Sequence, residues 1–308
     1  MFDEDLRGRD VLVTGAAGFI GNALCARLTA LGARVTGCGR SAPPQGFAGT
    51  WVRCDLTDLK AVQSLLAGCR PGLVFHMAGR TLGDQGKDAV WPTLRDNLLA
   101  TVPLLVGLAG SDCRRIVVTA SLRDPAGDPE GGSEPVPLSP YAAAKAASSA
   151  YARMFHRLYQ LPVVIARPFM VYGPGPQDMS KLVPFVASRL MAGHEVPLSS
   201  GQAAFDFVFV DDVVDAMVAL ATTSGLEGRT FDVGTGRLST VAEVANTIAL
   251  RLGQPRLLKL GALPDRRFEP QRAADVATTA AVAHWRARVP LSDGIDRFLA
   301  WYAKSPPQ

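Results

Sequence analysis

The chain has 308 residues, 48% of them hydrophobic, and a formal net charge of +4. Its length exceeds the usual size of one domain, so we expect one large domain with an additional smaller lobe. The basic residues are scattered rather than clustered, which excludes a dedicated nucleic-acid-binding protein, and no apolar run is long enough to span a membrane.

The first residues, MFDEDLRGRD, are charged and lack the apolar core of a signal peptide. The five cysteines are far apart in the sequence and include no CxxC spacing. This usage is typical of reduced thiols in a protein without a zinc site. We therefore predict a cytoplasmic protein that binds no metal.

Short buried strands alternate with amphipathic helices through the first half of the chain. Strand patterns occur at 10–14, 33–39, 72–76, 114–119 and 161–168, and helical patterns at 22–32, 59–68, 93–110 and 139–155. The alternation predicts a doubly wound parallel α/β (Rossmann) domain over 1–168. After Pro168 the pattern changes, and 169–308 are expected to form mainly a smaller substrate-binding lobe, with segments near 204–235 returning to the sheet.

A glycine-rich turn, VTGAAGFIG, follows the first predicted strand and opens the first predicted helix. Its glycines permit a tight turn and a close approach of the backbone to a diphosphate, which the helix N-terminus attracts. The alternative is a plain turn, but the strand–turn–helix context favours a dinucleotide site. We expect this site to include Gly15, Gly18, Phe19, Ile20 and Gly21.

A tyrosine and a lysine, Tyr141 and Lys145, lie four residues apart in the predicted helix SPYAAAKAASSAYARMF. This spacing places both side chains on one helical face, one turn apart. The ammonium favours the ionised phenolate, so the tyrosine becomes a better acid near neutral pH. A chance pair on a solvated helix is the alternative.

The sequence resembles the extended short-chain dehydrogenase/reductase family, which includes nucleotide-sugar epimerases, dehydratases and reductases. The resemblance covers nearly the whole chain and is carried by TGAAGFIG, CDLTD, FHMAG, DNLLAT, TAS, YAAAK, RPFMVYGPG, FDFVFVDDV, FDVGTG and WYAK. It implies that Ser121 hydrogen-bonds the substrate oxygen and that Tyr141 transfers the proton. It also implies that Lys145 holds the nicotinamide ribose and that Asn97 supports the site.

The same resemblance assigns the remaining cofactor contacts. Asp55 and Leu56 are expected along the adenine, Ala78 and Gly79 near the nicotinamide, and Pro168 to Val171 over the nicotinamide amide. Relatives that use NAD carry an acidic residue after the second strand, where this chain reads GCGRS. Because Gly39, Arg40 and Ser41 leave room and a positive charge for a 2′-phosphate, we predict NADP(H) over NAD(H). The alternative is an exposed Arg40, with NAD bound by the backbone.

Two departures from the family pattern bear on the reaction and the substrate. Dehydratases carry an Asp-Glu pair where this chain has Leu122 and Arg123, so we do not expect elimination of water. Many relatives carry an arginine for the nucleotide diphosphate where this chain has Phe205. Nearby cations offer a replacement, and our substrate-side candidates are Arg123, Lys181 and Arg267, the last in a cluster with Arg266 and Arg272. A solvated basic loop is the alternative for this cluster.

Within the family that the sequence resembles, the predicted NADP preference and the missing dehydratase pair favour an NADPH-dependent ketoreductase acting on a nucleotide-linked 4-keto-deoxy sugar. A nucleotide-sugar epimerase with tightly bound NAD(P) is the alternative, because it needs the same catalytic residues. A non-catalytic NADP-binding regulator is a third hypothesis, which the intact Tyr141 and Lys145 disfavour. The resemblance also implies a homodimer formed through the helices of Asn97 and Tyr141. His76, in the FHMAG motif, is expected to be a core histidine rather than an acid or a ligand.

Overall fold

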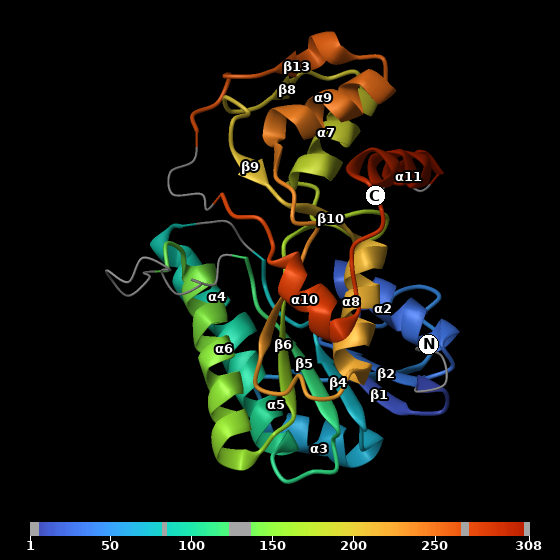
Figure 1. The fold of residues 1–308 in the computed structure, drawn as a ribbon, viewed down its shortest axis with the longest axis vertical. Helices are drawn as coiled ribbons and strands as arrows, with labels where there is room; N and C mark the ends of the chain where they lie inside the picture. The colour runs from blue at the N-terminus through green and yellow to red at the C-terminus, as the bar shows by residue number, and fades with distance from the viewer. Residues whose placement is uncertain (1–5, 82–84, 123–136, 266–270, 305–308) are drawn as a thin grey trace.

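The computed structural model describes residues 6–81, 85–122, 137–265 and 271–304. Its central sheet has seven parallel strands in the order β11-β6-β5-β4-β1-β2-β3 (Figure 1). The strands are β1 (Asp10–Thr14), β2 (Arg34–Gly39), β3 (Thr50–Arg53), β4 (Leu73–His76), β5 (Arg115–Thr119), β6 (Val163–Pro168) and β11 (Thr230–Val233). The order reverses between β1 and β4, and a crevice for a ligand opens at the carboxyl ends of strands at such a point. The doubly wound α/β fold predicted from the sequence is confirmed.

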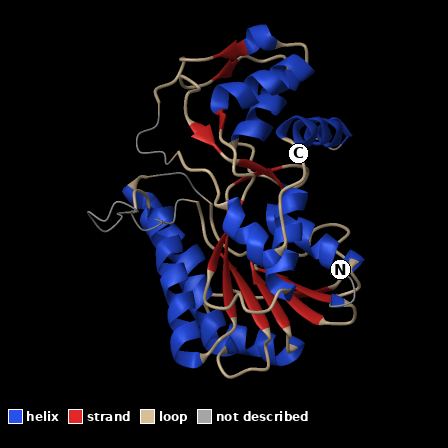
Figure 2. Ribbon diagram, viewed as in Figure 1, coloured by secondary structure: helices blue, strands red, loops and turns tan. Residues whose placement is uncertain are grey.

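Helices cover both faces of this sheet (Figures 1 and 2). On one face lie α2 (Phe19–Ala30), α8 (Val210–Thr222) and α10 (Val276–Ala283), and on the other α3 (Leu59–Cys69), α5 (Ala100–Leu108) and α6 (Pro140–Tyr159). Two hydrophobic cores result, one around Leu24 and Met217, the other around Leu104 and Phe155. Burial on both faces explains why the strands read as continuous apolar runs.

The helical segment before α5 is irregular. A 3₁₀ turn, η1 (Lys87–Ala89), leads into α4 (Val90–Leu94), and a π-helical turn, η2 (Arg95–Leu99), joins α4 to α5. The sequence pattern predicts one regular helix over 93–110, so the π turn is a difference. Such turns occur often at functional sites, and this one contains Asn97.

The second lobe is built on helices and short strand pairs around its own core. Its helices are α7 (Leu182–Met191), α9 (Val241–Arg251), the 3₁₀ turn η3 (Pro255–Leu257) and α11 (Leu291–Lys304). The pairs are β7 (Met170–Tyr172) with β10 (Phe207–Phe209), β8 (Val196–Pro197) with β13 (Leu258–Lys259), and β9 (Ala204–Phe205) with the antiparallel β12 (Ser239–Thr240). A capping box of Thr240 and Glu243 begins α9, where the sequence places a helix start.

A buried carboxylate, that of Asp206, fastens the lobe to the sheet. Asp206 accepts hydrogen bonds from the N–H groups of Thr235, Gly236 and Ala274. The segment after Ala274 continues into α10, which packs against β11 and α8 rather than within the second lobe. The chain therefore crosses between the sheet domain and the second lobe more often than its hydrophobic pattern indicates. The pattern shows that a helix has an apolar face but not which surface that face covers.

Candidate functional site

The glycine-rich turn lies where β1 meets α2, and its glycines are required by close packing. Gly15 has φ +65°, and a Cβ there would lie 2.7 Å from the backbone nitrogen of Ala78. A Cβ on Gly21 would lie 2.2 Å from the carbonyl oxygen of Gly15. Gly18 occupies the N-cap of α2, and no side chain in the described ranges caps this helix. The first-turn amides, including those of Phe19 and Ile20, are therefore available to an anion, and the cradle fits a dinucleotide diphosphate.

Two aromatic rings cover the end of β2, next to the predicted adenosine site. A Cβ on Gly39 would lie 3.1 Å from the indole of Trp51, and one on Gly37 would lie 2.6 Å from the ring of Phe47. The indole N–H of Trp51 donates to the carbonyl of Ser41 at 3.0 Å. A side chain at Gly39 would therefore require a small shift of the Trp51 indole.

Two neighbouring residues of the π turn η2 pair with the residues that follow β2 and β3. Asp96 lies between Arg40 and Arg80, and each guanidinium is 3.1 Å from one of its carboxylate oxygens. Arg95 donates to Asp55 at 2.9 Å. Hydrogen bonds from the N–H and the hydroxyl of Thr57, and then the charge of Arg95, hold the pKa of Asp55 below its ordinary value. The Arg40–Asp96 and Arg95–Asp55 ion pairs therefore connect the predicted adenosine site to the turn that carries Asn97. The sequence gives no signal for them beyond adjacency to Asn97.

The Tyr141–Lys145 pair lies in the first two turns of α6, which begins at the N-cap Ser139. The Ser139 hydroxyl accepts from the N–H of Ala142 at 3.1 Å, and Pro140 starts the helix. The ammonium of Lys145 is buried and donates to the backbone carbonyl of Thr119 at 2.9 Å. Ser121, also buried, follows two residues after Thr119. Strand β5 and helix α6 thus bring the three predicted catalytic residues to one edge of the sheet.

Asn97 reaches the same place from the π turn. Its carboxamide nitrogen donates to the carbonyls of Thr93 at 2.9 Å and Arg80 at 3.2 Å. Its oxygen Oδ1 is buried and has no hydrogen-bond partner among the described residues. A Cβ on Gly79 would lie 2.6 Å from this oxygen and 3.3 Å from Nζ of Lys145. Asn97 and Lys145 therefore approach the turn after β4 closely, and an unpaired acceptor remains beside them.

The second lobe contributes to the other side of this edge. Pro168 ends β6, and the half-buried Val171 lies in β7, on the passage into the lobe. The amine of Lys181 donates to the carbonyl of Thr81 at 3.2 Å, in the segment that follows Gly79. A further contact ties the loop after β7 to the cradle, because a Cβ on Gly175 would lie 3.2 Å from the ring of Phe19.

The other predicted substrate cations are placed differently. Arg123, Arg266 and Arg267 lie outside the described residues. Arg272 pairs with the buried Asp232 and lies over the ring of Phe169, with 5.3 Å between the guanidinium and the ring centroid. This arginine therefore joins the second lobe to β11, and its contacts are structural.

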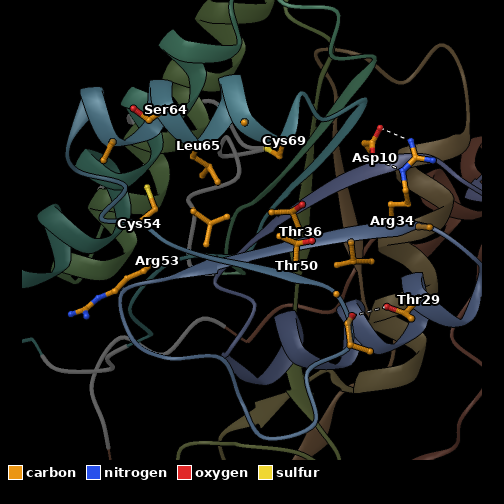
Figure 3. A pocket seen from close by; sticks show the side chains of 17 residues that line it. Asp10, Thr29, Arg34, Thr36, Thr50, Arg53, Cys54, Ser64, Leu65 and Cys69 are labelled. Atoms are coloured by element: carbon orange, nitrogen blue, oxygen red, sulfur yellow. Dashed lines mark hydrogen bonds and ion pairs between the residues drawn. The ribbon is translucent and has the colours of Figure 1, made fainter.

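A large open hollow lies away from this edge. It measures about 960 Å³ and is lined by β2, β3 and α3, with the Asp10–Arg34 ion pair at one end (Figure 3). Two of the five free cysteines, Cys54 and Cys69, line it. None of the predicted catalytic residues does, so the hollow is not the candidate active site.

The part of the chain that the structure describes shows no cluster of three or more His, Cys, Asp or Glu side chains suited to a metal ion. Among its helices, none combines the length and the apolar composition needed to cross a membrane.

Comparison with known proteins identifies the family. The model of the NAD-dependent epimerase/dehydratase family matches residues 11–234. A UDP-glucose 4-epimerase of Mycolicibacterium smegmatis is 33% identical, covering 94% of this chain and 97% of that protein. A dTDP-glucose 4,6-dehydratase of an Actinoplanes species is 29% identical, covering 95% and 97%. The solved structure of MoeE5 with UDP-glucuronic acid and NAD is 30% identical, with a TM-score of 0.85 over 96% of this chain and 99% of that one. With its glycine cradle, Tyr-x-x-x-Lys helix and doubly wound sheet, the chain belongs to the NAD-dependent epimerase/dehydratase family, as its resemblance to the extended short-chain dehydrogenases/reductases predicts.

Proposed function

We propose that the protein catalyses a reversible oxidation and reduction at one carbon of a nucleotide-linked sugar. The observation that carries this proposal is the placement of Lys145. Its buried ammonium is held by the Thr119 carbonyl, one helical turn from Tyr141 and beside Gly79, whose neighbour Ala78 contacts Gly15 of the cradle. A buried cation beside a phenol, at a site built for a diphosphate, suits proton transfer coupled to nicotinamide chemistry.

The residues divide the work as follows. Ser121 binds the sugar oxygen, Tyr141 holds the proton that this oxygen loses or gains, and Lys145 stabilises the phenolate. The coenzyme, when bound in the cradle of Gly15, Gly18 and Gly21, accepts or donates the hydride at the same sugar carbon. Asn97 offers its unpaired oxygen at the turn next to Lys145.

The net reaction that we put first is epimerisation with NAD(P) retained. The support is the 33% identical UDP-glucose 4-epimerase, which covers 94% of the chain. The ketoreductase expected from the sequence is the second candidate, and the support for it is Gly39 followed by Arg40, which suits the 2′-phosphate of NADPH. Dehydration is not proposed, because Leu122 and Arg123 stand where the family's dehydratases carry an acid and a base.

One experiment separates these reactions. The purified protein is incubated with UDP-hexoses and NAD, and separately with a nucleotide-linked ketosugar and NADPH. An epimerase produces the 4-epimer with no net change in the absorbance of reduced nicotinamide. A ketoreductase consumes NADPH in proportion to the ketosugar. If the protein binds coenzyme but does neither, the regulatory hypothesis replaces both.

The diphosphate of the substrate needs a cationic partner, and we keep Lys181, Arg123 and Arg267 as the proposed ones. Lys181 is held at the mouth of the site by Thr81. Substitution of each by alanine is expected to raise the KM for the nucleotide sugar without changing coenzyme affinity. An unchanged KM removes that residue from the proposal.

We also propose a homodimer in the cytoplasm. Support for the dimer comes from exposed apolar side chains on neighbouring helices: Leu99 and Val106 beside α6, and Tyr151 and Leu158 on it. The spacing of seven residues in each pair places its members on one helical face. Light scattering is expected to give twice the chain mass, and Leu158→Glu the single mass. A monomeric parent protein would contradict the dimer. The five free thiols support a reducing compartment.

A further inference from the structure

A buried chain of polar contacts runs beneath the proposed active site. The N–H of Ala78 donates to Oγ1 of Thr14 at 3.2 Å, and this hydroxyl is 2.8 Å from Nδ1 of His76. On the other side of the ring, Nε2 lies 2.9 Å from Oγ1 of Thr101. The Thr101 hydroxyl in turn donates to the backbone carbonyl of Asn97 at 2.6 Å. Thr14, His76, Thr101 and Asn97 are all at most 3% exposed.

The direction of this chain follows from counting protons. A carbonyl only accepts, so the Thr101 hydroxyl gives its single proton to Asn97 and must accept from Nε2. The ring therefore carries its proton on Nε2, and its bare Nδ1 accepts the proton of the Thr14 hydroxyl. In the opposite tautomer, with the proton on Nδ1, the Thr101 hydroxyl could donate its one proton to either the Asn97 carbonyl or the bare Nε2. The other of these two acceptors would then face a lone pair of the hydroxyl. Buried polar groups rarely remain unpaired in this way, so the count selects one tautomer.

Both ends of the chain reach groups of the proposed site. Ala78 contacts the cradle, since a Cβ on Gly15 would meet its backbone. At the other end, the unpaired Oδ1 of Asn97 lies against Gly79, which Nζ of Lys145 also approaches. The carbonyl of His76 also accepts from Oγ1 of Thr119 at 3.0 Å. His76 therefore touches three elements that build the site without facing the substrate itself.

We propose that His76 is a positioning residue for Asn97: as the neutral Nε2–H tautomer, it fixes Asn97 against the coenzyme cradle through Thr14 and Thr101. Burial, and secondly the charge of Lys145, lower the pKa of His76 to about 3. The ring is therefore neutral at about pH 7, as the hydrogen bonds to Thr14 and Thr101 require. Only the expected effect on kcat rests on the proposed function; the tautomer of His76 and the position of Asn97 do not.

The test is made at Thr101 and uses a matched set of variants. Thr101→Val keeps the shape of the side chain and removes the hydroxyl, while Thr101→Ser keeps the hydroxyl. Thr222→Val is the control, because the Thr222 hydroxyl donates to a carbonyl four residues earlier in α8, far from the site. Thr101→Val is expected to lower kcat by about 10- to 100-fold with little change in the KM for coenzyme, as a misplacement near 1 Å would. Thr101→Ser and Thr222→Val should stay close to the parent.

A second measurement does not depend on turnover. In protein labelled with nitrogen-15 in histidine and asparagine, the His76 resonances are assigned from those lost in His76→Gln. They should show a protonated Nε2 and a bare Nδ1, and Thr101→Val should shift the Asn97 amide signals more than Thr222→Val does. A protonated Nδ1, or unchanged Asn97 signals, would overturn the inference. If the parent turns over no nucleotide sugar, the proposed function fails, and the spectra alone decide the role of His76.

Discussion

The ammonium of Lys145 and the backbone carbonyl of Thr119 are joined by a hydrogen bond of 2.9 Å, across 26 residues of sequence. The bond ties the second turn of α6 to the end of β5. Because Lys145 is 5% exposed, its position is set by this bond and by packing rather than by solvent. The register between strand and helix therefore determines where Tyr141 and Ser121 lie relative to each other.

Substituting Tyr141 and Lys145 one at a time should separate the effect on the reaction from the effect on stability. Tyr141→Phe is expected to lower kcat by about 10²- to 10⁴-fold, because the proton carrier is lost. Coenzyme affinity and the melting temperature should stay near those of the parent. Tyr159→Phe is the control, since Tyr159 lies exposed at the end of the same helix. Steady-state kinetics and coenzyme fluorescence measure the effects, and an active Tyr141→Phe protein would contradict the assignment.

Lys145→Met should have a different signature. The variant keeps the Tyr141 phenol but removes the ammonium that we propose stabilises its phenolate, and it leaves the buried Thr119 carbonyl without this donor. An unpaired buried polar group costs about 1–3 kcal/mol, so the free energy of unfolding should fall along with kcat. Urea unfolding followed by circular dichroism measures it. A drop in kcat at full stability would show that Thr119 finds another donor.

The three glycines of the cradle should not tolerate alanine equally. Gly21→Ala places a Cβ 2.2 Å from the Gly15 carbonyl oxygen, whereas Gly18→Ala places one 3.2 Å away with no positive φ to strain. Overpacking of rigid backbone costs about 1–3 kcal/mol, so Gly21→Ala should melt earlier and bind coenzyme more weakly than Gly18→Ala. Thermal melts and fluorescence titration of both variants test this order, and equal behaviour would contradict it.

The coenzyme preference should depend on Arg40. If its guanidinium receives a 2′-phosphate, Arg40→Met should weaken NADPH binding by about 1.5–3 kcal/mol, the worth of a charge-assisted hydrogen bond, and leave NADH unchanged. Arg27→Met is the matched control, since Arg27 is also half-exposed and paired with an aspartate, Asp215, at 3.0 Å. Equal losses for NADH and NADPH would show that Arg40 does not read the phosphate.

An acidic residue introduced at Gly39 tests whether the coenzyme preference can be shifted toward NADH. Gly39→Asp alone is expected to weaken both coenzymes, because its Cβ would press on the indole of Trp51 at 3.1 Å. Gly39→Asp with Trp51→Val should admit the carboxylate and shift the preference toward NADH. Dissociation constants for both coenzymes measure the shift. A single variant that already favours NADH would show that the indole yields.

Sequence patterns predict the backbone of this site better than its side-chain pairings. The strand–glycine–helix unit around Gly15 and the four-residue spacing of Tyr141 and Lys145 are local, so propensity and spacing are sufficient to locate them. Asp96 beside Arg40 is not predicted, because an ion pair across 56 residues depends on the π turn that aims the carboxylate. Arg272 looks like a free cation in the sequence, yet Asp232 binds it once β11 has joined the sheet.

The free energy of unfolding should depend on pH in a way that reports the protonation of His76. In the unfolded chain the imidazole takes up a proton below about pH 6.5, whereas in the folded protein it stays neutral down to about pH 3. The folded pKa is lowered, so this contribution to stability is present above pH 6.5 and is lost as the pH falls toward 3. One such proton lowers the free energy of unfolding by about 1.4 kcal/mol per pH unit within that window.

His76→Gln lacks this titration, while every carboxylate still titrates in both proteins. The stability advantage of the parent over His76→Gln should therefore shrink steadily as urea unfolding is repeated from about pH 7 down to about pH 5, where an ordinary histidine is protonated. Thr222→Val, which removes no titratable group, should run parallel to the parent over the same range. Parallel curves for His76→Gln as well would mean that the buried ring takes up its proton in the folded protein, and the neutral tautomer assigned to it would then be wrong.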